Sequence, residues 1–216
     1  MGSITRSFAN NITTSGVLLP ASLTNNSIAN VTSYNAAIAT GNMVLISSQT
    51  ASNSASLSFT TGINSTYKEY QFYFIDIHAR TDNVNFTFNL STDSGSNYNV
   101  TKTTTYFRAI HSEGDADGFG YSGGSDLAQS TGEQILTEST GNDADQSIAS
   151  YMSLFNPSST TYVKHFIAVI NNYTQDNYSE NDYLAGYGNT TSAINAVRFQ
   201  MSSGNFDGTI LMYGIV

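Results

Sequence analysis

Short runs of alternating apolar and polar residues fill most of the chain after residue 42. The clearest run, VNFTFNLS at 84–91, has an apolar side chain at every second position, with asparagine and threonine between them facing outward. This period of two predicts a strand with one face on a core. The run EYQFYFIDIHA at 69–79 is apolar on both faces, which predicts a central strand. Further strands are predicted at 43–50, 54–60, 99–110, 133–139, 146–156, 161–174, 193–204 and 209–216.

The spacing of these runs favours an all-β fold. Glycine, asparagine, aspartate, serine and both prolines fall between the runs, where turns are expected. No stretch of useful length has helical periodicity. About eight to ten strands over residues 43–216 predict an antiparallel β-sandwich. The long polar connection at 111–146 favours a jelly-roll-like sandwich over a simple meander.

The first 42 residues have a different composition. Their short apolar groups are separated by small polar residues, and Phe8 and Tyr34 are the only aromatic residues. Such a segment cannot bury enough surface to offset its ordering entropy by itself. We therefore predict an extended N-terminal arm at 1–42 that is ordered by neighbouring chains. The last run, 209–216, is apolar on both faces and predicts a strand inside a sheet or against another subunit.

Composition excludes several classes of function. Only 11% of residues are charged, against roughly 25% in ordinary soluble domains. The formal net charge is −9 and the cations are scattered singly, which argues against binding to a phosphate backbone. Cysteine is absent, so there is no disulfide framework and no cysteine zinc site. No run is long enough to cross a bilayer, and residues 1–16 lack the apolar segment of a secretory signal.

One acidic stretch, HSEGDADGFG at 111–120, begins like a calcium-binding loop. Glu113, Asp115 and Asp117 stand at alternate positions, as oxygen ligands do in such loops. The position that should carry the bidentate glutamate is Gly124, and no helices flank the loop. We favour a solvated acidic loop, with a weak Ca²⁺ site as the alternative. No other cofactor is predicted.

The sequence contains little that indicates catalysis. Residues 120–124 read GYSGG, close to the GDSGG of chymotrypsin-type proteases, but Tyr121 replaces the aspartate. The three histidines are far apart and form no H-x-H pair that a cupin-like metal site would need. His165 shares the parity of apolar neighbours, which favours a packed histidine. We therefore predict no enzymatic activity; a hydrolase using Asp115 or Ser122 is the least favoured alternative.

Tyrosine and amide side chains are the main candidates for recognition. The stretch NNYTQDNYSENDYLAGYGN at 171–189 is predicted to be an exposed recognition loop. Such loops bind sugars or proteins without using charge. Pairing of the same side chains across strands is an equally good interpretation. The candidate recognition residues are Tyr173, Tyr178, Tyr183 and Tyr187.

Several phrases of the sequence carry a resemblance. The N-terminal segment contains ITTSGVL and SLTNNSIANVTS, and the rest runs from MVLISSQTASNSASLSFTTGI through YQFYFIDIHARTDNVNFTF to GTILMYGIV. In these phrases the chain resembles structural proteins of tailed bacteriophages, particularly those of cyanophage type. The N-terminal part is similar to trimeric fibre and spike shafts, and the remainder to jelly-roll modules of fibres and capsid-decoration proteins. The resemblance carries no catalytic motif.

The resemblance implies a homotrimeric virion protein that is made in the host cytoplasm. Its arm would attach to other virion proteins and its sandwich would be displayed outward. An arm that cannot fold alone independently favours partner chains in a closed cyclic assembly. A tail fibre and a capsid decoration remain equally open. The alternative is a carbohydrate-binding module that recognises a host-surface glycan through its tyrosine- and asparagine-rich loops.

Overall fold

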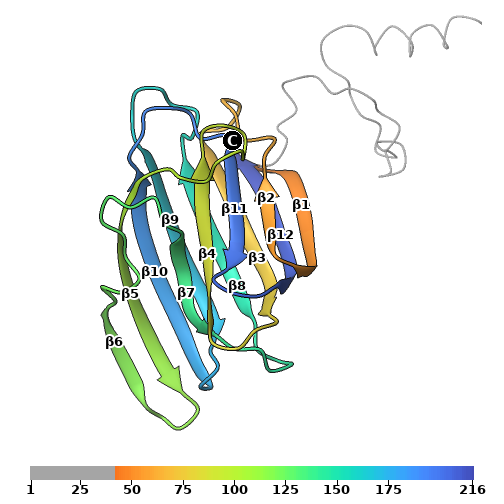
Figure 1. Cartoon of the computed structure of the whole chain (residues 1–216), viewed down its shortest axis with the longest axis vertical. Coiled ribbons are helices and arrows are strands. Elements are labelled where there is room, and N and C mark those ends of the chain that lie inside the picture. The colour runs from red at the N-terminus through yellow and green to blue at the C-terminus, as the bar shows by residue number, and fades with distance from the viewer. Residues whose placement is uncertain (1–41) are drawn as a thin grey trace, which may run out of the picture. The chain divides into compact units, whose positions relative to one another are not determined.

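Two antiparallel sheets lie face to face in the computed structural model, which describes residues 42–216 (Figure 1). The arm predicted at 1–42 lies, apart from its last residue, outside the described residues. The first strand begins at Met43. No helix occurs in the described part of the chain, and the strands confirm an all-β, sandwich-like arrangement. Within residues 42–216, nothing forms a helix long and apolar enough to cross a membrane.

Twelve strands divide unequally between the two sheets. The large sheet contains, in spatial order, β1 (Met43–Ser54), β12 (Phe206–Ile215), β3 (Glu69–Ala79), β8 (Ile148–Phe155), β9 (Lys164–Tyr173), β10 (Tyr178–Gly188), β5 (Lys102–Ser112) and β6 (Asp117–Tyr121). The small sheet contains β2 (Ser56–Phe59), β11 (Ala196–Met201), β4 (Val84–Ser91) and β7 (Gln134–Thr140). Neighbouring strands are antiparallel throughout.

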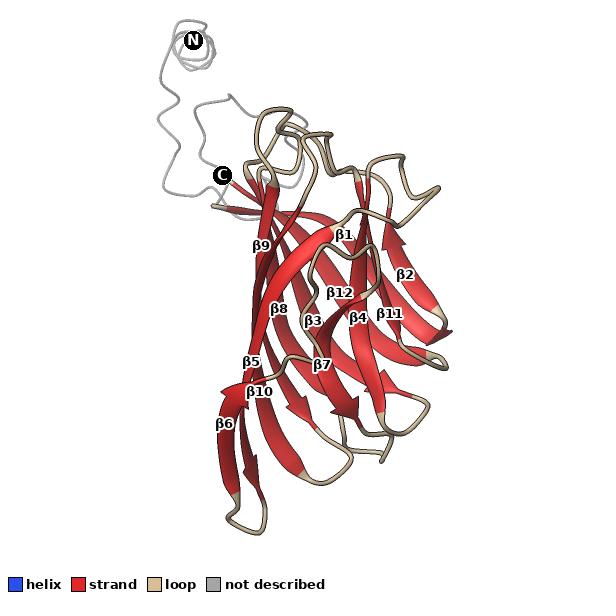
Figure 2. Ribbon diagram, turned by 60° about the vertical axis from the view of Figure 1, so that its left-hand side comes forward, coloured by secondary structure: helices blue, strands red, loops and turns tan. Residues whose placement is uncertain are grey.

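The small sheet covers only part of the large one. Strand β2 contacts β1 at one side, and β7 contacts β9 and β10 at the other. Strand β6 lies at the far edge of the large sheet, beyond the four strands of the small sheet (Figures 1 and 2). The large sheet therefore has one face that is partly covered by the small sheet and one outer face that no described segment covers.

Phenylalanine side chains fill most of the space between the sheets. Phe199 of β11 lies at the centre, with ring centroids 5.2–6.4 Å from five other phenylalanine rings. These rings belong to both sheets, since β3 is in the large sheet and β2 and β4 are in the small one. Two of these contacts are edge to face, and aromatic contacts of this kind add to the free energy gained from burying the rings. The alternation predicted at 84–91 supplies two of these rings.

The strand predictions at 69–79 and 84–91 match β3 and β4 residue for residue, and β3 is central as predicted. The run at 209–216 is also confirmed as an internal strand, because β12 lies between β1 and β3. Gly208, the residue before this run, has a φ of 122° and lies at a register shift between β12 and β3. A Cβ there would lie 2.5 Å from the Asp76 carbonyl oxygen, so the position requires glycine.

Two predictions about connections are wrong. The region 111–146 contains β6 as well as β7, and β6 forms a hairpin with β5. The stretch 171–189 is the β9–β10 hairpin rather than a loop. The pattern of β10 misled the prediction because Glu180 and Asp182 occupy its inward positions, where an apolar residue is expected.

Candidate functional site: the outer face of the large sheet

The outer face of the large sheet carries most of the exposed apolar side chains. Ten large apolar residues are exposed within the described part of the chain, and eight of them lie on this face. These eight are Met43, Leu45, Ile75, Phe107, Phe119, Tyr121, Tyr151 and Ile167. A sheet face in water normally carries polar residues, so this concentration identifies the face as a candidate contact surface.

One row of directly paired residues crosses the face from β12 to β6. We call it the apolar row; its members, in spatial order, are Leu211, Tyr73, Tyr151, Val169, Tyr183, Phe107 and Tyr121. Each residue is the direct partner of the next across neighbouring strands, where side chains contact each other most closely. Only Ser48, which pairs with Leu211 at the β1 end, is polar.

The rings of the apolar row contact one another. Phe107 and Tyr183 are stacked, with centroids 4.9 Å apart and planes inclined by 8°. Tyr73 lies 6.0 Å from Tyr151 and meets Tyr213 edge to face at 5.6 Å. Phe119 of β6 extends the group, edge to face with Phe107. These contacts form two groups of rings on the face, one on each side of Val169.

Charge is absent from the apolar row and from the rows on either side. The row toward Leu45 continues through Tyr213, Gln71, Ser153, Ile167, Ala185 and Thr105. The row on the other side contains Thr209, Ile75, Ala149, Asn171, Asn181, Ala109 and Phe119. A chain with a net charge of −9 therefore presents three adjacent rows that contain no aspartate, glutamate, lysine, arginine or histidine.

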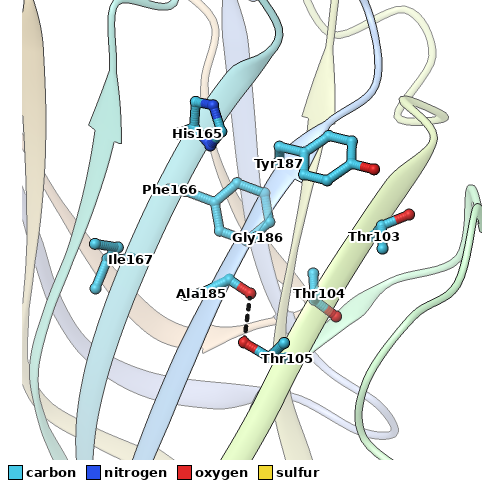
Figure 3. Close-up of a pocket in the computed structure, with 9 residues that line it drawn as sticks. All are labelled: Thr103, Thr104, Thr105, His165, Phe166, Ile167, Ala185, Gly186 and Tyr187. Atoms are coloured by element: carbon cyan, nitrogen blue, oxygen red, sulfur yellow. Dashed lines mark hydrogen bonds between the residues drawn. The ribbon is translucent and has the colours of Figure 1, made fainter.

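A shallow hollow of about 430 Å³ interrupts this face near one end. Ala185 lies at its floor, because its methyl group leaves space between larger neighbours. Figure 3 shows His165 and Tyr187 beside it, with Thr103 and Thr105 along β5. The Thr105 hydroxyl donates a hydrogen bond to the Ala185 carbonyl oxygen at 3.3 Å. The hollow combines aromatic surface with hydroxyl and imidazole groups, a chemistry that suits a neutral polar ligand.

The structure separates the four predicted recognition tyrosines. Tyr183 and Tyr187 lie on the outer face, with Tyr183 in the apolar row. Tyr173 lies at the end of β9, where its hydroxyl donates to Glu113 Oε1 at 3.1 Å. Tyr178 has the parity of the opposite face. His165 is exposed on the outer face rather than packed, because β9 presents that parity to the outside.

The three acidic residues of the candidate calcium loop lie in the β5–β6 hairpin. Asp115 faces His111 at 3.4 Å, while Glu113 accepts the bond from Tyr173. Asp117 starts β6 and is exposed. Within residues 42–216, no group of three or more acidic or histidine side chains is arranged to hold a metal ion. The geometry gives the calcium interpretation no support.

The residues considered for a hydrolase contact different partners. His78 is half-buried near the end of β3, where its Nδ1 lies 2.7 Å from the Gln146 carbonyl oxygen. Ser122 follows β6, and its hydroxyl lies 3.1 Å from that of Ser125. These contacts do not form the linked nucleophile and base that acyl transfer needs.

A group of partly and fully buried polar side chains lies beneath β5 and β10 and joins the two sheets. Arg108 Nη1 lies 2.7 Å from Glu138 Oε2 of the small sheet and 3.4 Å from Glu180 Oε2 of the large sheet. Asp182 follows on β10 and is fully buried, as is Tyr106 of β5. We call these five residues the acid cluster. It contains three carboxyl groups and one guanidinium, so full ionisation would leave excess negative charge in the interior.

Burial changes the acidity of this cluster. It raises the pKa of Glu180 to about 8, with the charge of Asp182 acting in the same direction and Arg108 opposing. Burial also raises the pKa of Asp182 to about 6, and the positive charge of Arg108 opposes that rise. The pKa of Tyr106 is raised by burial and by Asp182. The cluster can hold a proton near neutral pH, but its buried carboxyl groups are closed to a substrate.

Comparison with known proteins identifies no relative: no family model, curated protein or solved structure matches the chain.

Sequence reasoning missed the apolar row and the acid cluster. Most members of the row lie in strands that the sequence predicted, and the others lie in β6 and β10, whose polar residues looked like a loop. The residues form one row only because of the register in which these strands pair. The available signal was that several strands are apolar on both faces, as at 69–79. A strand that is covered by a second sheet on one face needs apolar side chains on that face only. Apolar side chains on both faces therefore indicate a second contact surface.

Proposed function

We propose that the protein is a non-enzymatic structural component of a phage virion, a homotrimeric appendage of the fibre or capsid-decoration class. Its N-terminal segment attaches it to other virion proteins, and its sandwich is displayed outward. The observation that carries this proposal is the uncharged apolar row across the outer face of the large sheet. A protein surface of this kind is stable in water when another protein covers it.

The strand order supports a jelly roll within this proposal. Four antiparallel pairs are nested along the chain, namely β1 with β12, β2 with β11, β3 with β8 and β4 with β7. Successive pairs alternate between the two sheets, in the orders β1-β12-β3-β8 and β2-β11-β4-β7. Nested pairing of this type is how a jelly roll is built, and it is common in viral capsid proteins. The remaining strands widen one sheet.

The size of the outer face suits a stable interface. Eight strands spaced about 4.8 Å apart extend about 34 Å, and three rows of side chains cover about 20 Å across them. The resulting area of roughly 700 Å² approaches the ~800 Å² per partner of a standard interface. A second copy of the chain is a suitable partner for this face. A charged partner would gain no electrostatic attraction from a face without charge. Two copies that each carry a net charge of −9 would repel each other least where the contact surface is uncharged.

A cyclic trimer needs two different patches on each chain. The apolar row is long enough to supply both, since Tyr73 and Tyr151 lie over one half of the sheet and Phe107 and Tyr183 over the other. Each half can contact a different neighbour around a three-fold axis.

The test is the mass of the full chain in solution, measured by light scattering. We expect three chains per particle, and Tyr151→Lys should dissociate them because it places a charge in the middle of the row. Tyr162→Lys is the matched control: Tyr162 is 69% exposed but lies outside the face, so this variant should remain trimeric. A monomeric wild-type protein would contradict self-association. A dimer would retain the interface but contradict the trimer.

The virion assignment needs a separate measurement. Antibodies raised against the purified chain should label phage particles released from the host that carries the gene, as seen by electron microscopy. Particles that carry no label, from cells shown to make the protein, would refute this part of the proposal whatever the oligomeric state.

The hollow beside Tyr187 favours a second candidate function, binding of a neutral carbohydrate. A tyrosine ring can stack on a sugar ring, and Thr103, Thr105 and His165 can bond its hydroxyl groups. A glycan array should then give specific signals that Tyr187→Ala removes and Tyr162→Ala retains. An array without signal would reject this function and leave the structural proposal intact.

A further inference from the structure

A buried lysine and a buried asparagine contact each other across the two sheets. Lys102 begins β5 in the large sheet, and Asn89 belongs to β4 in the small sheet. Lys102 Nζ donates to Asn89 Oδ1 at 2.6 Å and to the Val100 carbonyl oxygen at 2.9 Å. Their exposed fractions are 0% and 1%, although the alternation at 84–91 predicted that Asn89 faces outward. Both side chains are therefore held away from water.

A carboxylate completes this group. Asn89 Nδ2 donates to Glu133 Oε1 at 3.4 Å, and also to the carbonyl oxygens of Tyr98 and Thr131. Arg198 Nη2 lies 2.5 Å from Glu133 Oε1 and holds the carboxylate in place. Glu133 Oε2 is buried and accepts no hydrogen bond from any described residue. That oxygen is free to take a proton.

The environment of Lys102 makes its amine easier to deprotonate than an exposed lysine. Burial lowers the pKa of Lys102 to about 8, while the negative charge of Glu133 opposes this change. The two acceptors of Nζ match the two N–H groups of a neutral amine, whose nitrogen keeps a lone pair. A lysine desolvated in this manner is a nucleophile.

The distances bring the amine close to the amide carbon. Because a C=O bond is about 1.23 Å long, an Nζ placed 2.6 Å from Oδ1 lies at most about 3.8 Å from the Asn89 Cγ. This distance is close to the ~3–3.5 Å of a reactive conformation. The Leu90 backbone N–H also donates to Asn89 Oδ1, at 2.8 Å. It can stabilise the negative charge that develops on this oxygen during attack.

We propose that Lys102 and Asn89 become joined by an isopeptide bond in the folded protein, with Glu133 carrying the proton. Lys102 Nζ attacks Asn89 Cγ to form a tetrahedral intermediate, and Glu133 accepts a proton from Nζ. The bond from Cγ to Nδ2 then breaks, Glu133 returns the proton to Nδ2, and one ammonia leaves. The products are a secondary amide and ammonia, so no oxidant or other reactant is needed. The reaction occurs once in each chain, without turnover.

The second buried lysine provides a comparison within the same protein. Lys164 is also fully buried, and its Nζ donates to the backbone carbonyl oxygens of Tyr162 and Thr190. No side-chain amide within residues 42–216 accepts a hydrogen bond from it. Backbone amides are held in the chain and offer no ammonia as a leaving group, so Lys164 should stay unmodified. Both lysines pair with Gly188 across neighbouring strands, which makes their positions closely matched.

The bond would tie the small sheet to the large sheet. It would close the segment between Asn89 and Lys102, which includes the turn after β4 and the approach to β5. A covalent closure restricts the unfolded chain, as a disulfide does, in a protein that has no cysteine. An uncrosslinked variant should therefore melt at a lower temperature than the wild-type protein.

Mass spectrometry tests the proposal directly on the purified full chain. The intact mass should be lower than the sequence mass by one ammonia. Trypsin should fail to cleave after Lys102, because its amine is acylated, and should release peptide 81–108 in one piece, lighter by one ammonia. Unmodified protein would instead release the peptides 81–102 and 103–108. A succinimide at Asn89 would also lose ammonia, but trypsin would still cleave after Lys102, so the uncleaved peptide distinguishes the proposed bond from a succinimide. Separate peptides and an unchanged intact mass, in protein shown by circular dichroism to be folded, would overturn the proposal.

Three variants identify the reacting groups. Lys102→Arg and Glu133→Gln should both retain the full sequence mass, the first because it removes the nucleophile and the second because it removes the proton carrier. Lys164→Arg, the matched control, should show the same ammonia loss as the wild-type protein. A Glu133→Gln variant that still crosslinks completely would remove Glu133 from the mechanism. An ammonia loss that persists in Lys102→Arg would overturn the proposed bond.

Discussion

The space between the two sheets is filled differently at its two ends. Toward β2 and β11, phenylalanine rings from both sheets contact one another around Phe199. Toward β7 and β10, Glu180, Asp182 and Tyr106 of the acid cluster occupy equally buried positions. The same large sheet supplies one wall of both ends, so the difference lies in the side chains and not in the architecture.

This difference separates stability from chemistry. Buried rings gain free energy from leaving water, and that gain does not depend on pH. Buried ionisable groups lose solvation and must hold a proton, a partner or a covalent bond instead. The aromatic end should therefore determine how stable the fold is, and the polar end how that stability responds to pH. The following predictions test this separation.

The largest effect is expected at the aromatic end. Phe199→Ala removes a fully buried ring that contacts five others, and should lower the free energy of unfolding by about 3–5 kcal/mol. Urea titration at fixed protein concentration measures this change. Phe119→Ala is the control, because this ring is 76% exposed on the outer face. When the subunits are dissociated, this variant should lower the free energy of unfolding much less than Phe199→Ala does. Equal losses for the two variants would show that the aromatic end is not the stabilising core.

The polar end should make stability fall as pH rises. The folded-state pKa values of Glu180 and Asp182, about 8 and about 6, are raised above their ordinary values of 4.5 and 3.8. The folded protein therefore binds more protons than the unfolded chain between these limits, so their stabilising contribution is complete below about pH 4 and is lost as pH rises to about 8. The melting temperature, measured from pH 5 to pH 9, should decrease across this range.

Neutralising one carboxyl group of the cluster should reduce that slope. Glu180→Gln removes the group with the larger rise in pKa. Between pH 5 and pH 8, the variant should lose less free energy of unfolding than the wild-type protein does, by on the order of 1–3 kcal/mol. Glu113→Gln, at an exposed glutamate of the β5–β6 hairpin, should leave the slope unchanged. A Glu180→Gln variant with the wild-type slope would assign the pH dependence to other groups.

The smallest effect is expected from an ion pair at the rim of the aromatic end. Arg80 Nε lies 2.7 Å from Asp207 Oδ2, but the Arg80 side chain is half exposed. Solvent screens such a pair, so Arg80→Ala should cost less than about 1 kcal/mol. The difference should shrink further in 1 M salt, as measured by urea titration. A loss comparable to that of Phe199→Ala would mean that rim charges, and not the rings, hold this end together.

The outcome of the sequence predictions follows from the range of the forces involved. Alternation and turn residues are patterns of a few neighbouring positions. They predicted both ends of β3 and β4 correctly, and the ends of most other strands to within a few residues. The same local pattern failed at β10, because Glu180 and Asp182 point inward into the acid cluster. There Glu180 contacts Arg108, a residue far away in the sequence. It failed again at β6, whose glycine-rich residues look like a loop until they pair with β5.

What the sequence determined by itself is therefore the class of fold, the central position of 69–79 and the placement of 209–216 inside a sheet. Each of these depends on side chains that repeat every second residue along one strand. Only the tertiary structure decided that the surplus apolar residues form one row across the outer face, and that Asn89, Lys102 and Glu133 meet. Those groups come from different strands and loops, and their distances are set by sheet pairing and packing that no local pattern contains.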